Sequence, residues 1–222
     1  MSNTVAGRAG EALTNWRPDT FGLYTPAGGR KYLNHAERQR ALAAIEFLEP
    51  GQALFALTLA WTGARVSEVL ALTAASFQID CGIVALHTLK RRKLAVREVP
   101  VPPELIAALD RHFGIAARQR DPLAADRRLW PWCRVTAWRI VKRAMQRSGI
   151  NGPHACPRGF RHGFGVGTLQ ARVPLNLLQR WLGHARISTT AIYADACGPD
   201  ELGFAIQFWR QSEERLHASP KP

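Results

Sequence analysis

Apolar positions recur at helical spacing over most of the chain and alternate like a strand over one short stretch. Residues 34–51 begin with Asn34 and Glu37, spaced as in a capping box, which predicts a helix. Residues 52–63 are apolar on nearly all faces and end in glycine, a pattern typical of a buried helix. The apolar positions in residues 64–77 predict a further helix that turns one face inward.

The stretch 82–102 has a different character, because its β-branched and apolar residues favour strands. The basic run Lys90–Lys93 lies in its middle, which predicts a β-hairpin with a basic tip. Helical patterns follow over residues 103–114, 134–150, 158–183 with a break at 173–174, and 198–216. The predicted fold class is therefore α+β, mainly helical with a small antiparallel sheet.

Charge adds the first indication of a partner. The chain has 30 Lys and Arg against 17 Asp and Glu, a net charge of +13, and such an excess favours a polyanion, above all nucleic acid. Four widely spaced cysteines and an N-terminus without an apolar core predict free thiols in the cytoplasm. No apolar run reaches the roughly 18 residues that a membrane span requires, so no membrane partner is expected.

Candidate chemistry lies in a set of polar residues near the ends of predicted elements. The set contains five cationic or hydrogen-bonding side chains and one phenol: Arg65, Lys90, Arg158, Arg161, His184 and Tyr193. No acidic cluster suits Mg²⁺ and no glycine-rich loop precedes Lys-Ser/Thr, so we expect neither metal nor cofactor. Metal-free phosphoryl transfer fits instead, since arginines neutralise phosphate oxygens, Lys or His protonates the leaving oxygen, and tyrosine acts as nucleophile.

Three segments carry a resemblance to a known family: TGARVSEVLAL at 62–72, RGFRHGFG at 158–165 and LGHARISTTAIY at 182–193. In this order, with a basic hairpin between the first two, they resemble the motifs of the tyrosine recombinases, the phage integrase family. The resemblance covers about residues 30–212. It implies a lead-in over residues 1–30, a catalytic domain over 31–213 and a tail over 214–222. The compact length is similar to fimbrial phase-switch recombinases and plasmid-borne integrases.

The resemblance implies a role for each matching residue. Arg65 and Arg161 match the two catalytic arginines, and Glu68 matches the acidic residue that supports them. His184 matches the residue that hydrogen-bonds the scissile phosphate. Tyr193 matches the nucleophile, which forms a 3′-phosphotyrosyl link that a 5′ hydroxyl later reverses without ATP.

The hairpin lysine and the residue before the second arginine are less closely matched. Lys90 is the preferred match for the general acid on the leaving 5′ oxygen, with Lys93 as the alternative. Arg158 stands where the family usually has His; because arginine stays protonated at neutral pH, it would stabilise charge there rather than move a proton. A second departure is the missing N-terminal helical domain, which clamps the far side of the DNA in larger relatives.

The resemblance implies a site-specific DNA recombinase that integrates, excises or inverts DNA, or resolves plasmid multimers. The implied partner is double-stranded DNA, bound by a dimer at one site and a homotetramer at paired sites. One alternative is a catalytically impaired DNA-binding accessory protein, and another is a topoisomerase-like enzyme that acts alone. Basic residues on the hairpin tip and on 134–150 are candidates for DNA contact: Arg91, Arg92, Lys93, Arg139, Lys142 and Arg143. A solvated helix face is the other interpretation of Arg139, Arg143 and Arg147, which recur every four residues.

Overall fold

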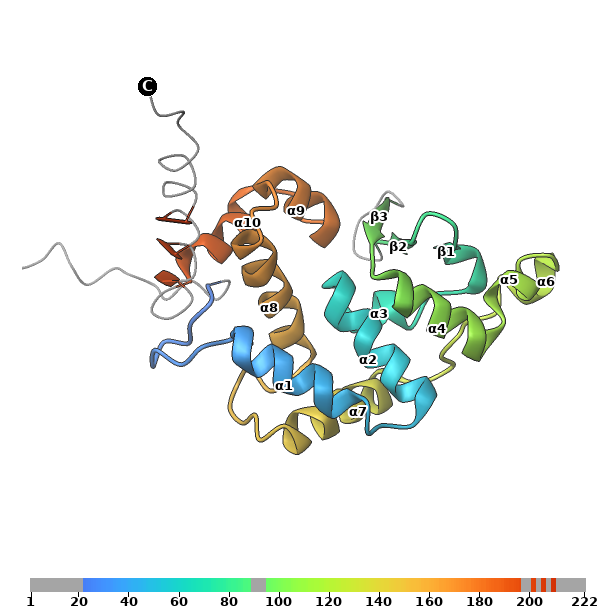
Figure 1. The fold of residues 1–222 in the computed structure, drawn as a ribbon, viewed down its shortest axis with the longest axis horizontal. Coiled ribbons are helices and arrows are strands. Elements are labelled where there is room, and N and C mark those ends of the chain that lie inside the picture. The colour runs from blue at the N-terminus through green and yellow to red at the C-terminus, as the bar shows by residue number, and fades with distance from the viewer. Residues whose placement is uncertain (1–21, 89–94, 197–200, 203–204, 207–208, 211–222) are drawn as a thin grey trace, which may run out of the picture.

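The computed structural model describes residues 22–88, 95–196, 201–202, 205–206 and 209–210 (Figure 1). Its α-helices are α1 His35–Ile45, α2 Pro50–Thr62, α3 Val66–Val69, α4 Pro103–Phe113, α5 Ile115–Arg118, α6 Pro122–Ala125, α7 Arg134–Arg147, α8 Pro157–Gln170, α9 Leu175–Leu182 and α10 Ser188–Ala191. Two 3₁₀-helices are η1 Ala74–Ser76 and η2 Ile192–Asp195. The strands are β1 Phe77–Gln78, β2 Ile83–His87 and β3 Val96–Pro100. The predicted fold class is confirmed.

The sheet is antiparallel in the order β1-β2-β3. Val84 of β2 pairs with Phe77 on one side and with Val99 on the other, and all three side chains are buried. Strand alternation explains this burial, because every second side chain of β2 and β3 turns to the core. The predicted hairpin is confirmed, and β1 adds a strand that was not predicted. The basic tip, including Lys90, lies outside the described residues.

The helix predicted over residues 64–77 is wrong beyond its first turn. The helical segment α3 ends at Val69, and the chain then runs through η1 into β1. Thr73 is extended, with φ −122° and ψ 174°, and its N–H donates to Ser76 Oγ at 3.2 Å. Such a local bond from backbone to side chain competes with the helical hydrogen-bond ladder. Leu72 and Phe77 still reach the core, so apolar spacing alone did not separate the two arrangements.

Two clusters of buried side chains make up the interior. The first packs α1–α4, α7 and the sheet together, and the second joins residues 23–32 to α8, α9 and η2. Leu23, which falls within the predicted lead-in, belongs to this second cluster. On α8, Phe160 belongs to the first cluster and Phe164 to the second, so Arg161 lies between them. Figure 1 shows α8–α10 rising on one side and α2–α4 with the sheet on the other.

No helix in the described part of the chain combines the length and the apolar character that crossing a membrane requires.

Candidate active site

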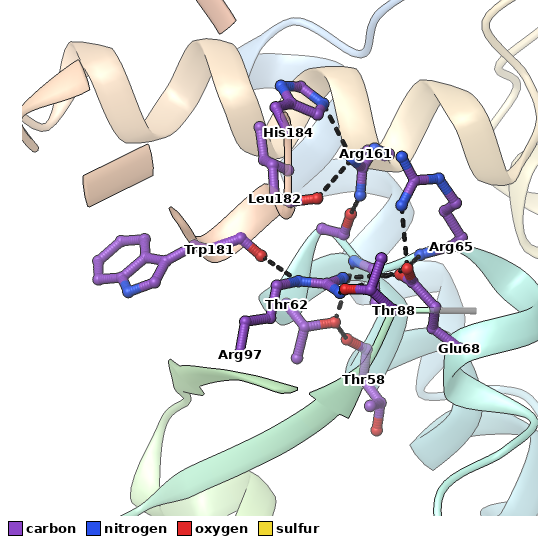
Figure 2. Close-up of polar contacts among 12 residues, drawn as sticks. Thr58, Thr62, Arg65, Glu68, Thr88, Arg97, Arg161, Trp181, Leu182 and His184 are labelled. Atoms are coloured by element: carbon purple, nitrogen blue, oxygen red, sulfur yellow. Dashed lines mark hydrogen bonds and ion pairs between the residues drawn. The ribbon is translucent and has the colours of Figure 1, made fainter. Parts of the chain in front are cut away.

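Arg161 is held by the carboxyl ends of two helices. Its NH1 donates to the carbonyl oxygen of Gly63 at 2.6 Å, and its NH2 donates to that of Leu182 at 2.8 Å (Figure 2). The helices α2 and α9 end at Gly63 and Gly183, whose φ values of 60° and 65° suit glycine and turn the last carbonyls outward. Carbonyls at a helix C-terminus carry partial negative charge, which favours the guanidinium. Burial lowers the pKa of Arg161 to about 10, so it stays protonated at neutral pH.

Arg65 and Glu68 form the second part of the site, at the start of α3. Glu68 accepts from the Arg65 backbone N–H at 2.8 Å and from Arg65 NH1 at 2.9 Å. The Glu68 side chain is 1% exposed, whereas that of Arg65 is 32% exposed and available to a ligand. Burial alone would raise the pKa of the Glu68 carboxyl, but hydrogen bonds and charge from Arg97 and Arg65 outweigh it and lower the pKa.

Arg97 of β3 completes this cluster and was missed in the sequence. Its NH2 lies 2.6 Å from Glu68 Oε2, its Nε donates to the Trp181 carbonyl at 2.7 Å, and its NH1 donates to Thr88 Oγ1 at 3.2 Å. It therefore joins the hairpin, α3 and the end of α9 (Figure 2). A signal was present in the sequence, because Arg97 occupies the inward-facing phase of the alternation that buries Val99.

His184 follows the end of α9 and contacts Arg161 directly. Its Nε2 lies 2.9 Å from Arg161 NH2, and its Nδ1 lies 2.9 Å from Thr190 Oγ1. Burial, together with the charges of Arg161 and Arg65, lowers the pKa of His184 to about 3. The imidazole is therefore neutral at physiological pH.

Tyr193 lies beside these residues and is almost fully buried. Its ring stacks near His184 with centroids 6.2 Å apart, and His162 lies 5.7 Å away on centroids. A Cβ on Gly165 would come within 2.6 Å of the Tyr193 ring, so the absence of a side chain at Gly165 makes room for it. Burial raises the pKa of the Tyr193 phenol, while the charges of Arg161 and Arg65 act in the opposite direction.

The structure thus brings together most of the predicted catalytic set. Arg65 pairs with Glu68, Arg161 contacts His184, and the charges of Arg65 and Glu68 act on Arg161, while the Tyr193 ring lies near His184. Arg158 lies one turn before Arg161 on α8 and is exposed. Lys90 and the predicted DNA contacts Arg91, Arg92 and Lys93 lie outside the described residues.

The candidates on α7 have different surroundings. Arg139 and Arg143 are exposed, and Arg143 donates to Gln52 Oε1 at 3.1 Å. Lys142 is partly buried and donates to the Ala155 carbonyl at 3.3 Å. Within the described residues, Arg139 makes no side-chain hydrogen bond like those of the other two, which makes it the simplest of the three to test.

The arrangement is suited to binding an anion next to a phenol. Arg161 has five N–H donors, of which three meet protein acceptors, and the partly exposed Arg65 adds a second guanidinium. Within the described ranges, no group of three or more His, Cys, Asp or Glu side chains could hold a metal ion. Arg65 and Arg161 are the two guanidinium groups that this arrangement offers to an anion.

The neutral histidines give the fold a pH dependence. Burial and the nearby arginines lower the pKa of His184 to about 3, and burial lowers that of His162 to about 4. An unfolded histidine has a pKa near 6.5, so below that pH the unfolded chain binds more protons. The stability that these histidines contribute is therefore present above about pH 6.5 and is lost as pH falls toward about 4.

We expect His184→Gln to reduce the loss of unfolding free energy between pH 7.5 and pH 5. After solvent screening of the partly exposed ring, the reduction should be about 1 kcal/mol. Urea unfolding at both pH values measures it, with the exposed His87→Gln on β2 as the matched control. An unchanged pH difference in His184→Gln would contradict the neutral state of the buried ring.

Comparison with known proteins agrees with the geometry. The profile described as Phage integrase family matches residues 31–197, and the chain belongs to this family. A relative named tyrosine recombinase XerD, from Chlorobaculum tepidum, is 32% identical over 138 residues, covering 60% of this chain and 44% of that protein. Another XerD, from Ralstonia nicotianae, is 32% identical over 173 residues, covering 73% of this chain and 55% of that protein.

The fold also matches a solved catalytic domain. The catalytic domain of bacteriophage HP1 integrase superposes with a TM-score of 0.57 at 24% identity, covering 80% of this chain and 94% of that one. This likeness establishes the fold. The chain spans only about half the length of the two XerD proteins, at 44% and 55%.

Proposed function

We propose that this protein is a site-specific recombinase that cleaves and rejoins DNA strands through Tyr193. The observation that carries the proposal is the pairing of Arg161, fixed between two helix ends, with a partly exposed Arg65 beside a tyrosine. Two guanidiniums can bind the non-bridging oxygens of one phosphodiester. The adjacent phenol is the nucleophile that such a site requires.

In the proposed reaction, the Tyr193 oxygen attacks the phosphorus and a 3′-phosphotyrosyl bond forms. The bond from phosphorus to the 5′ oxygen breaks, and Lys90 supplies the proton that this oxygen takes up. Arg65 and Arg161 neutralise the charge on the non-bridging oxygens as it develops. The phenol is protonated at neutral pH, and the same two positive charges favour its ionisation when the phosphate arrives, with its proton passing to water as the bond to phosphorus forms.

Arg158 is proposed as a further charge-stabilising residue rather than as a base. It is exposed on the first turn of α8, one turn before Arg161, and is among the charges that lower the pKa of His162. A guanidinium cannot accept a proton at neutral pH, so Arg158 cannot act as the base that a histidine at this position could provide.

The helix α7 is proposed to contact the DNA backbone. Replacing a lysine or arginine that contacts a phosphate lowers the slope of log K against log salt concentration by about 1. We expect this for Arg139→Gln, measured by fluorescence anisotropy at several salt concentrations. Arg147→Gln is the matched control, because its guanidinium packs over the Phe47 ring at 6.0 Å from the centroid. If Arg139→Gln and Arg147→Gln gave equal slopes of log K against log salt concentration, the proposed contact of Arg139 with a phosphate would be wrong.

The proposed assembly is a dimer on one DNA site and a homotetramer on paired sites, in the cytoplasm. The free thiols of Cys81, Cys133 and Cys156 suit a reducing compartment. The predicted C-terminal helix at 198–216 is a candidate for packing on a neighbouring protomer, although most of it lies outside the described residues. Integration, excision, inversion and resolution of plasmid multimers are the outcomes that this chemistry could serve.

A nicked suicide substrate tests the proposal. Binding sites would first be selected from a random duplex library, and nicked versions of the bound sequence incubated with the protein in EDTA. We expect a protein–DNA adduct on a denaturing gel, with the nucleotide mapped by mass spectrometry to the tryptic peptide 187–210, which contains Tyr193 alone among the tyrosines.

Other outcomes distinguish the alternatives. Specific binding without an adduct would overturn the recombinase proposal and favour an accessory DNA-binding protein. Relaxation of supercoiled plasmid by adduct formation at a single site, with no dependence on a second site, would favour a topoisomerase-like enzyme. Exchange between two sites on one plasmid, read by restriction mapping, would complete the support for recombination.

A further inference from the structure

The hydrogen bonds of His184 define which of its nitrogens carries the proton. Arg161 NH2, 2.9 Å from Nε2, can only donate, so Nε2 must accept. A neutral imidazole has one N–H, which must then be on Nδ1 and donate to Thr190 Oγ1 at 2.9 Å. In this DNA-free state, His184 therefore turns a lone pair, not a donor, toward the place where Arg161 would meet an anion.

A phosphate oxygen at this place needs the opposite arrangement. An anion accepts hydrogen bonds, so His184 must present Nε2–H, and its Nδ1 must then accept a hydrogen bond. Thr190 is fully buried, with 0% exposure, and it is the residue that faces Nδ1. A hydroxyl both donates and accepts, so Oγ1 can accept from Nδ1–H in one state and donate to Nδ1 in the other.

We propose that Thr190 is a positioning residue. Its hydroxyl lets His184 change tautomer when a phosphate takes the place of His184 Nε2 as the hydrogen-bond partner of Arg161. In the change, one proton leaves Nδ1 for water and one joins Nε2 from water, so the ring stays neutral. The Thr190 O–H then rotates to donate to Nδ1. This inference rests on the proposed function for its second state, whereas the first state concerns the chain without DNA.

Thr190 lies on the same short segment as Tyr193, so the residue that positions His184 is close to the proposed nucleophile. Its backbone N–H donates to the Ile187 carbonyl at 2.8 Å, which fixes it on α10, and it stands three residues before Tyr193. The Tyr193 ring in turn stacks near His184. The hydroxyl that holds the imidazole and the nucleophile thus come from one short segment, so the position of one constrains the other.

The first arm of the test measures the tautomer without DNA. In ¹⁵N-labelled protein, two-bond ¹H–¹⁵N spectra separate the two tautomers, and His184→Gln identifies the signal. We expect Nδ1–H in the wild-type chain and also in Thr189→Val and Thr190→Val, because Arg161 NH2 donates to Nε2 in each of them. A wild-type Nε2–H signal would overturn the proposal.

The second arm measures cleavage of the nicked duplex under single-turnover conditions. Removing a group that orients a reacting side chain typically costs about 10- to 100-fold, so Thr190→Val should lose at least about tenfold in rate with unchanged DNA affinity. Thr190→Ser should stay within about threefold of wild type. Thr190→Ala replaces the valine variant if that variant melts below the assay temperature.

The two arms separate the two proposals. If wild type forms no adduct, the proposed function fails, and the tautomer measurement still tests the state of His184 in the free chain. If Thr190→Val cleaves at the wild-type rate while wild type forms the adduct, Thr190 is not a positioning residue.

Discussion

We expect the substitution Tyr193→Phe to abolish the covalent adduct and to leave DNA binding intact. Phenylalanine keeps the ring that packs over Gly165 and near His162, and it removes only the oxygen that would attack phosphorus. We expect the cleavage rate to fall by at least about 10⁴-fold, as when a covalent nucleophile is removed. The measurement is single-turnover cleavage of the nicked duplex, alongside binding by anisotropy.

The other tyrosines provide the controls for this prediction. Tyr24 and Tyr32 are the remaining tyrosines of the chain, and their hydroxyl oxygens lie 3.3 Å apart. We expect Tyr24→Phe and Tyr32→Phe to retain the adduct. An adduct that survives in Tyr193→Phe would show that another residue is the nucleophile. A melting temperature within about 3 °C of wild type would confirm that Tyr193→Phe is correctly folded.

We expect Arg97→Met to lower the free energy of unfolding by about 3–5 kcal/mol. The Arg97 and Glu68 side chains are 4% and 1% exposed and lie 2.6 Å apart, and removing Arg97 leaves the buried carboxylate with the partly exposed Arg65 as its remaining charged partner. The Trp181 carbonyl and Thr88 hydroxyl lose a donor as well. For a chain of this size, the melting temperature should fall by roughly 10 °C. Calorimetry or urea unfolding measures the change.

Two further variants test the cause of this loss. Arg120→Met, on the exposed surface, should stay within about 0.5 kcal/mol of wild type. Adding Glu68→Gln to Arg97→Met should destabilise less than the sum of the single changes, because the buried carboxylate that lost Arg97 is then neutral. Strict additivity, or a melting temperature unchanged in Arg97→Met, would contradict the proposed importance of this pair. Cleavage should also slow, since Glu68 holds Arg65 in place.

The elements with strong periodicity could be predicted from the sequence. The capping box of Asn34 and Glu37, with bonds of 2.8 and 3.0 Å, starts α1 as its spacing indicated. The strand-like alternation of apolar positions located the hairpin of β2 and β3. The helix prediction at 64–77 failed because one side-chain bond, from Thr73 N–H to Ser76 Oγ, diverts the backbone without changing the apolar spacing. Periodicity carries no information about such local competition.

The candidate site was predictable by residue identity but not by its supporting contacts. The order of the three motifs selected Arg65, Arg161 and His184. The structure places His184 against Arg161, with Arg65 close enough for its charge to lower the pKa of both. The sequence could not predict that the carbonyls of Gly63 and Leu182 accept from Arg161, because every residue has a backbone carbonyl and residue type does not distinguish them. Arg97 was missed because a basic residue next to a basic loop was not tested for the inward phase of its strand.

The two helix ends that hold Arg161 make its position depend on the folded state of the whole chain. Gly63 and Arg161 are 98 positions apart in the chain, so their contact forms only when distant segments have come together. In a chain that has partly unfolded, every reactive side chain is present but Arg161 has lost the two carbonyls that hold it. On the proposed chemistry, the ability to cleave DNA is therefore confined to folded molecules.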